Sequence, residues 1–258
     1  MGYFTVEVKP TILASHQAGN GSAMAGGDIL FDWTSFQIPK GAASLIGITV
    51  VFRGKNGGPQ TALDADFFFA KTLNGIAPAT MGLANGTAAC GPAVSNHILG
   101  FTRIDDAGAY GENGFDRFSI AKGGGTSPGF PNANLVIQGE PESGDNVGFD
   151  TIYLGAITGG AHDFGTTVLT RGAVTDDTTL IVETDKGSND DPDAELIFAV
   201  GDVIHTATDD VLGTIGSIGA FDTNNQPITF TAPITDDLGD DEELFNINPI
   251  RIVLSFEK

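Results

Sequence analysis

The fold is decided by the stretch Ile250-Arg251-Ile252-Val253-Leu254-Ser255-Phe256-Glu257-Lys258. Apolar residues occupy every second position from Ile250 to Phe256, which is the pattern of a β-strand with one buried face. Tyr3–Val8 alternates in the same way at the other end of the chain. We therefore predict that both ends are strands and that the last strand returns to pair beside an early one.

Further short apolar runs recur along the chain, and glycine at 36 positions punctuates them. Runs of this length between turn residues predict strands, whereas a sustained 3.6-residue period, which would predict helices, is absent from the sequence. The remaining predicted strands are Ile29–Phe31, Ser44–Arg53, Phe67–Lys71, Leu135–Ile137, Thr151–Leu154, Thr167–Thr170, Thr179–Glu183, Glu195–Val200, Val203–Thr206, Gly213–Ile218 and Pro227–Thr231.

Three Thr-Asp-Asp triplets, Thr175–Asp177, Thr208–Asp210 and Thr235–Asp237, fall where the chain needs turns. Asp hydrogen-bonds its own backbone and tolerates strained dihedrals, so the triplets indicate turns rather than a functional repeat. Gly75–Gly100 and Gly123–Asn134 are rich in small residues. We expect them to be extended loops that lie on a sheet or on a neighbouring subunit.

Charge is distributed unevenly along the 258 residues. The chain has 33 acidic and 12 basic residues, and from Thr170 onward it has 19 acids and 4 bases, against 14 and 8 before that point. We predict an all-β fold consisting of a jelly-roll-like β-sandwich of residues 1–166, completed by residues 249–258. An acidic small β-barrel is predicted as an insertion at residues 167–248.

The formal charge of -21 argues against binding to nucleic acid or to an anionic membrane surface. The longest apolar stretch, Ala42–Phe52, is too short to span a bilayer. Met1–Pro10 differs from a signal peptide, so we expect the protein to be made and kept in a cytosol. The single Cys90 cannot form an internal disulfide and is predicted to be a buried, inert thiol.

Candidate catalytic residues find little support in their sequence context. Gly125–Gly129 has the letters of a Gly-x-Ser-x-Gly nucleophile motif, but the glycines and prolines around it predict a loop. Asp64 and Asp66 would project from one face of a strand, as paired carboxylates do, yet they read more simply as the polar start of a buried strand. The histidines lack metal-ligand spacing. We expect no enzymatic activity.

Calcium is the best small-ligand hypothesis, because hard cations need several oxygen ligands within one flexible loop. Clustered acids without the spacing of an EF-hand can equally be a solvated surface. The residues that could supply the oxygens are Asp185, Asn189, Asp190, Asp191, Asp193 and Glu195. A second cluster with the same two interpretations contains Asp236, Asp237, Asp240, Asp241, Glu242 and Glu243.

Aromatic residues are mostly phenylalanine, with 18 Phe, three Tyr and one Trp. Sugar-binding platforms favour aromatics with a polar edge, so this composition indicates cores rather than glycan sites. Trp33 could stack on a sugar, but its strand-like surroundings favour a core or interface position. Trp33 and Phe36 are the residues we predict for a protein interface.

A family resemblance is carried by five stretches, namely the region from Phe31–Trp33 to Arg53–Gly54 with its Ile38–Gly41 turn, Gly201–Ile204, Leu212–Ile215, Ile228–Thr231 and Asp241–Asn246. Together these stretches resemble virion structural proteins of tailed bacteriophages, in particular marine cyanophage-like viruses. The resemblance covers about half the chain, and it implies a β-rich, non-enzymatic protein present in many copies on the capsid or tail. It does not transfer a function to any single residue.

The resemblance and the composition together lead us to expect a decoration protein on the outer surface of a phage capsid, assembled in the host cytoplasm. Its partners would be the major capsid protein, other virion proteins and sister copies, with a trimer as the first oligomer to test. A tail, baseplate or fibre component is an alternative within this class. A glycan- or calcium-binding adhesion module is the alternative from a different class.

Overall fold

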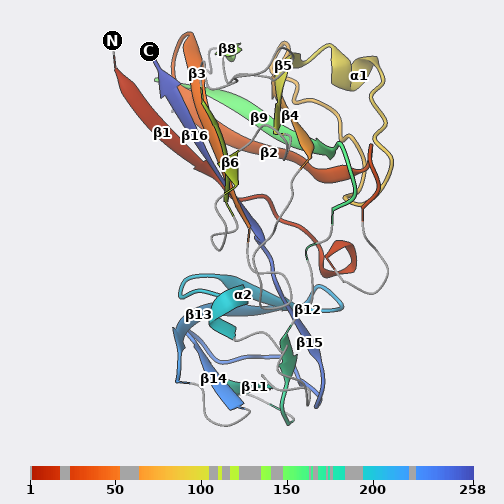
Figure 1. The fold of residues 1–258 in the computed structure, drawn as a ribbon, viewed down its shortest axis with the longest axis vertical. Coiled ribbons are helices and arrows are strands. Elements are labelled where there is room, and N and C mark those ends of the chain that lie inside the picture. The colour runs from red at the N-terminus through yellow and green to blue at the C-terminus, as the bar shows by residue number, and fades with distance from the viewer. Residues whose placement is uncertain are drawn as a thin grey trace.

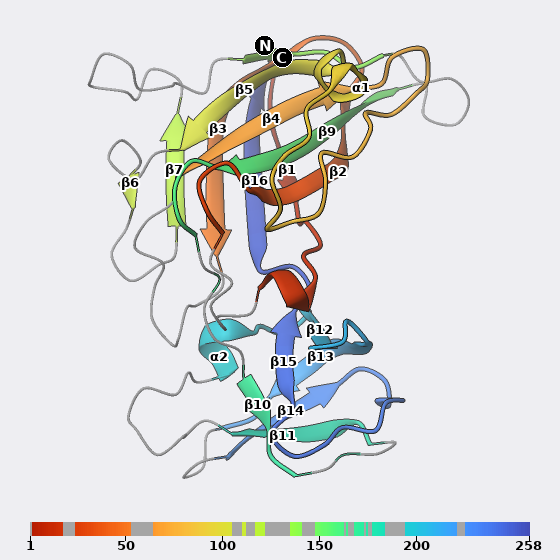
Figure 2. The ribbon, with the colours of Figure 1, turned by 90° about the vertical axis from the view of Figure 1, so that its right-hand side faces the viewer.

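The computed structural model describes residues 2–17, 24–52, 64–104, 110–111, 117–121, 135–140, 148–162, 164, 168–172, 174, 177–183, 194–220 and 225–258. Within these ranges the chain is nearly all β, and its helices have no more than four residues. The prediction of an all-β fold is therefore confirmed. Figures 1 and 2 show two lobes, one above the other, with both chain ends at the far end of the upper lobe.

The first sheet of the upper lobe contains both ends of the chain. Its spatial order is β1 (Tyr3–Val8), β16 (Ile250–Glu257), β3 (Ala43–Phe52), β7 (Arg117–Ala121) and β6 (Tyr110–Gly111), and β8 (Leu135–Ile137) also pairs with β3. Strand β16 runs antiparallel to both of its neighbours. The prediction that the last strand pairs beside an early one is confirmed.

The second sheet of the upper lobe faces the first. Its spatial order is β2 (Ile29–Pro39), β9 (Phe149–Thr158), β4 (Ala65–Lys71) and β5 (Ile98–Ile104). Alternate residues of both sheets point inward and form one apolar core, to which β16 contributes Leu254 and Phe256 and β4 contributes Phe67 and Phe69. The period-2 patterns of the sequence therefore mark the inner faces of a β-sandwich.

The order in which the chain visits the two sheets defines the topology of the sandwich. Strands β1, β3, β7 and β16 belong to the first sheet, and β2, β4, β5 and β9 belong to the second. The four-strand orders β1-β16-β3-β7 and β2-β9-β4-β5 are those of a jelly roll, in which two Greek keys close a double sheet.

The lower lobe is a closed barrel whose strands all fall between β9 and β16 in the sequence (Figure 1). Its order is β10 (Val168–Thr170), β11 (Thr179–Glu183), β14 (Asn225–Phe230), β13 (Val211–Ile218), β12 (Val203–Thr206) and β15 (Glu243–Asn246). A second apolar core fills the barrel, and Ile197 and Phe198 from the end of the short helix α2 (Ala194–Ile197) belong to it. The division into two domains at residues 166/167 and 248/249 stays a prediction.

Some elements differ from the sequence prediction. The run Glu195–Val200 was predicted to be a strand, but it begins within α2 and continues without a strand. Ile197 and Phe198 of this run are buried because they pack on the barrel core, a role that a helical turn serves as well as a strand. Strands β5, β6, β7 and β15 were not predicted. Gly75–Gly100 was expected to be an extended loop on a sheet. Its first part lies on the second sheet, where Met81 packs against Ile29 and Trp33, but its last part contains the helix Pro92–Ser95 and the start of β5.

Candidate functional site

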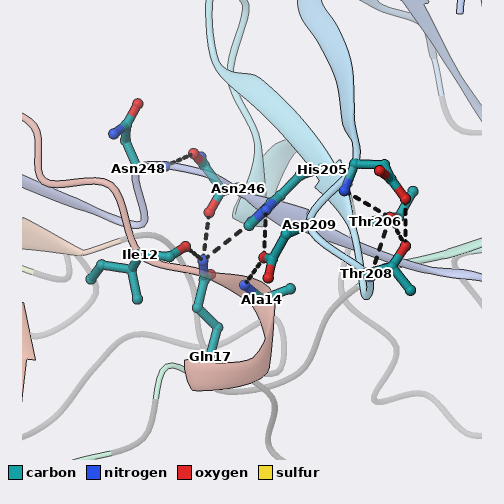
Figure 3. A network of polar contacts seen from close by, with 10 residues as sticks. Ile12, Ala14, Gln17, His205, Thr206, Thr208, Asp209, Asn246 and Asn248 are labelled. Atoms are coloured by element: carbon teal, nitrogen blue, oxygen red, sulfur yellow. Dashed lines mark hydrogen bonds and ion pairs between the residues drawn. The ribbon is translucent and has the colours of Figure 1, made fainter. Parts of the chain in front are cut away.

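The two lobes meet at a polar junction, which Figure 3 shows from close by. The upper lobe contributes the segment around the 3-10 helix η1 (Ala14–His16), which follows β1, and the lower lobe contributes β12 and β15. Ile12 donates a backbone hydrogen bond to the Ile247 carbonyl at 3.0 Å, and Ile247 donates to the Val203 carbonyl at 2.9 Å. The segment between β1 and η1 is thus hydrogen-bonded to the chain where it leaves the barrel.

Gln17 is the central side chain of this junction (Figure 3). It is buried, and its Nε2 donates to the Ile12 carbonyl at 2.5 Å and to the Asn246 carbonyl at 2.9 Å. These two carbonyls belong to different lobes, so one amide group connects them. Asn248 adds a similar link, because its Nδ2 donates to the carbonyl of Pro10 at 2.9 Å.

His205 lies beside Gln17 and is only 1% exposed. Its Nδ1 is 3.2 Å from Oδ1 of Asp209, and its Nε2 is 3.5 Å from Nε2 of Gln17. An Nδ1–H donated to Asp209 leaves Nε2 of the ring without a proton, and it faces the Gln17 amide nitrogen, whose two N–H groups are donated to the Ile12 and Asn246 carbonyls. Burial lowers the pKa of His205, and the nearby Asp209 carboxylate opposes that shift only in part. The imidazole is therefore neutral in the folded protein near pH 7.

Asp209 connects His205 to the upper lobe a second time. Its Oδ1 accepts a hydrogen bond from the backbone N–H of Ala14 at 2.7 Å. Its φ of 68° places it in the left-handed region, which Asp tolerates better than most residues. The Thr208–Asp210 triplet thus forms the turn between β12 and β13, as predicted from the sequence, and the turn also holds the junction.

The junction has an acid and a base but lacks the geometry of a hydrolytic site. The Nε2 atom of His205 faces the Gln17 amide instead of a hydroxyl group, and the imidazole is shielded from solvent. The nearby hydroxyl of Thr208 donates to Asp210 at 2.7 Å. A nucleophile must be within reach of its base and of substrate, so this arrangement supports attachment between lobes and not catalysis.

Trp33, a predicted interface residue, is half-buried on the outer face of the second sheet. It packs in a small apolar cluster with Met81, which comes from the loop over residues 72–91. Its indole N–H donates to the Ala79 carbonyl of that loop at 2.9 Å. The ring also lies against Gly155, where an added Cβ would be 3.0 Å from it. Trp33 therefore attaches the loop to the sheet.

Two other residues lie in places that differ from expectation. Phe36, predicted for an interface, is 7% exposed and packs in the sandwich core, where its ring stacks on Phe256. It occupies an inward position of β2, so its side chain offers no surface to a partner. Cys90 is exposed, so the prediction that it is buried was wrong. It lies in the loop that covers the sheet, just before helix α1 (Pro92–Ser95).

Another part of the second sheet's outer face carries aromatic side chains. Phe68 of β4 and Phe101 of β5 stack with ring centroids 5.4 Å apart, and Phe101 is 57% exposed. Beside them, Arg103 forms a two-pronged ion pair with Asp66, with both contacts at 2.7 Å. Asp66, a candidate acid-base residue, is thus engaged by a guanidinium group instead of forming a carboxylate pair with Asp64.

The exposed large apolar side chains of the described residues lie mainly on the sandwich. Six belong to that lobe, namely Tyr3, Ile76, Leu83, Phe101, Val136 and Phe149. The other three are Leu13 in the connection and Val200 and Val211 in the barrel. Apolar side chains of this size on a surface favour protein contacts when they lie near one another.

The predicted calcium loop cannot be placed, because Asp185, Asp190, Asp191, Asp193 and the side chain of Glu195 lie outside the described residues, as does the Gly125–Gly129 motif. In the second acidic cluster, Asp240 accepts from the Gly172 N–H at 2.5 Å and Glu242 accepts from the Gly239 N–H at 3.1 Å. These carboxylates stabilise turns. Across the described ranges, His, Cys, Asp and Glu side chains do not gather in groups of three that could hold a metal ion.

Sequence reasoning did not identify the residues of the junction. Gln17 and His205 are 188 positions apart, and neither belongs to a recognisable motif. The one available signal was the Thr208–Asp210 triplet, which predicted a turn but not its contact with Ala14.

In the described part of the chain, we found no helix with the length and apolar character needed to cross a bilayer. The chain matches no protein-family model, no curated protein and no solved structure.

Proposed function

We propose that the protein is a non-enzymatic structural component of a tailed-phage virion, a decoration protein on the outer capsid surface. In this role the sandwich binds the shell and the acidic barrel points away from it. The observation that carries the proposal is a difference between the two lobes. The barrel is strongly acidic, whereas most of the large exposed apolar side chains lie on the sandwich.

The barrel supports this proposal through its charge. Of the 33 acidic residues, 18 lie between positions 167 and 248, and only two basic residues accompany them. A surface of one sign stays hydrated and repels copies of itself, which keeps neighbouring particles apart. An acidic lobe is therefore suited to the solvent side of a particle.

The sandwich supports the proposal through its apolar side chains. Its outer surface carries Phe101, stacked on Phe68, together with most of the other large exposed apolar residues. Burial of such groups provides the main favourable free energy of most protein association. Jelly rolls occur in viral capsid proteins and also in lectins, so the fold by itself does not select between these classes.

Particles of the phage whose genome encodes the chain provide the test. We expect the chain to sediment with the particles in a density gradient and to be detected there by mass spectrometry in many copies. A chain that remains in the soluble fraction, or that is absent from washed particles, would overturn the proposal.

A pair of matched variants tests which lobe binds the shell. Phe101 in the sandwich is 57% exposed and Val211 in the barrel is 54% exposed, so serine at either position should leave the fold intact. We expect Phe101→Ser to reduce the number of copies on the particle and Val211→Ser to leave it unchanged. If both variants are present on the particle in equal numbers, the aromatic pair has no role in binding. If only Val211→Ser reduces the number of copies, the proposed orientation is reversed.

A further inference from the structure

Strand β1 forms one edge of the first sheet, and in Figure 1 no described element lies on its far side. The hydrogen bonds at its start establish which residues face that edge. Gly2 and Lys258 exchange two backbone hydrogen bonds, at 2.7 and 2.8 Å, and the register with β16 continues without a shift to Val8. In an antiparallel pair such exchanges involve every second residue. Phe4 and Val6 therefore bond to β16, and the backbone groups of Thr5 and Glu7 point away from it.

This edge lacks the features that usually prevent strand addition. Natural edge strands are protected by Lys, Pro, bulges or inward-pointing charges. Between Tyr3 and Val8 the chain has none of these, since Lys9 and Pro10 come only after the strand and Glu7 points outward. The strand is thus a regular edge of six residues that another strand can join.

The sequence of β1 is complementary to itself in the antiparallel direction. With Thr5 on a two-fold axis, all residues from Gly2 to Val8 find a partner in the second copy. Thr5 lies opposite Thr5, and Phe4 lies opposite Val6. Phe4 and Val6 are both half-buried against the sandwich core, so this register extends the apolar side of the sheet. Thr opposite Thr, and an aromatic residue opposite a β-branched residue, are among the cross-strand pairs that stabilise a sheet.

The charged side chain of β1 is also compatible with this antiparallel register. Glu7 would lie opposite Tyr3 of the second copy, so no carboxylate of the strand faces another. Within its own chain Glu7 already pairs with Arg251 and lies 3.9 Å from Lys9. For a chain with a net charge of -21, contact between copies requires a surface whose charges are absent or neutralised.

We propose that β1 pairs with β1 of a second copy and joins the two first sheets into one continuous sheet across a two-fold axis. The interface is isologous, and each Thr5 both donates to and accepts from its equivalent. The inference stands on the strand edge alone and does not depend on the proposed role in a virion. This contact makes a dimer, and a trimer would require a different surface.

The test is the mass of the full chain in solution by light scattering, without any virion component. We expect twice the 26.6 kDa of one chain. Thr5→Pro removes the N–H that faces the second copy, and it leaves the bonds of Phe4 and Val6 to β16 in place, which is the edge position that proline tolerates. Thr5→Pro should halve the mass, whereas the control Thr5→Val, which keeps the backbone donor, should remain a dimer.

A monomeric wild-type protein, or a Thr5→Pro variant that remains dimeric, would overturn the proposal. Circular dichroism establishes whether Thr5→Pro is folded. Amide hydrogen exchange on the wild type gives an answer that does not depend on any variant. Protection of the Thr5 and Glu7 amides that disappears on dilution supports the pairing, and rapid exchange at both amides in a concentrated sample contradicts it.

Discussion

His205 is a neutral imidazole enclosed between the two lobes, and its titration should affect the stability of the whole chain. Burial lowers its pKa below the ordinary value of 6.5, although Asp209 acts in the opposite direction. As the pH falls through 6.5, the unfolded chain binds a proton that the folded chain resists. The stability associated with the neutral ring is therefore complete above pH 6.5 and is lost as the pH falls toward the lower folded value.

The measurement is urea unfolding of the wild type and of His205→Gln at pH 7.5 and 5.5. We expect the wild type to lose more stability between these two pH values than the variant, since only the wild type titrates at this position. The other histidines are present in both proteins and cancel in the comparison. Equal losses would show that His205 does not resist protonation.

Gln17 gives a second prediction at the scale of the residue. Gln17→Met keeps the size of the side chain but removes the amide that bonds the Ile12 and Asn246 carbonyls. Buried acceptors left without donors cost about 1–3 kcal/mol, and we expect a loss of that size in the free energy of unfolding. The control Gln37→Met, at an exposed position of β2, should change it by less than about 0.5 kcal/mol. Similar effects at both positions would contradict the role of Gln17.

The elements of the fold were predictable where one face of a strand is buried and the other is not. β1 and β16 show this alternation, and both were predicted from it. β15 was missed because its four residues directly follow a run of acids that reads as a turn. β5 was missed because Gly100 interrupts it, and its position can be recognised only from its pairing with β4. The alternation of apolar and polar residues within one segment contains no information about such long-range pairing.

Helix α2 provides the prediction at the scale of the element. The Phe198 side chain just after it is 2% exposed and belongs to the core that fills the barrel. Phe198→Ala should cost about 3–5 kcal/mol, because it removes buried ring surface and leaves a cavity. Val200→Ala, two positions away at an exposed site, is the matched control, and it should cost less than about 0.5 kcal/mol. Chemical denaturation measures the free energy of unfolding of both variants. A small effect of Phe198→Ala would show that the barrel core does not depend on this side chain.

At the scale of the whole molecule, the jelly roll and the barrel are arranged end to end. The barrel lies between β9 and β16 in the sequence, so the chain enters and leaves it on the same side (Figure 2). The chain ends lie at the opposite end of the sandwich. The charge imbalance of the sequence led us to predict an insertion at residues 167–248, and that division stays a prediction. The imbalance did not predict the junction, in which Gln17 is 188 positions from His205 and meets the His205–Asp209 pair only after folding.

The most direct test of the proposed role is a cryo-electron microscopy map of particles of the tailed phage that, on this proposal, encodes the chain. We predict density for the chain on the outer surface of the shell, with the sandwich against the capsid and the acidic barrel projecting into solvent. A map without such density, or one in which the barrel contacts the shell and the sandwich faces outward, would contradict the account.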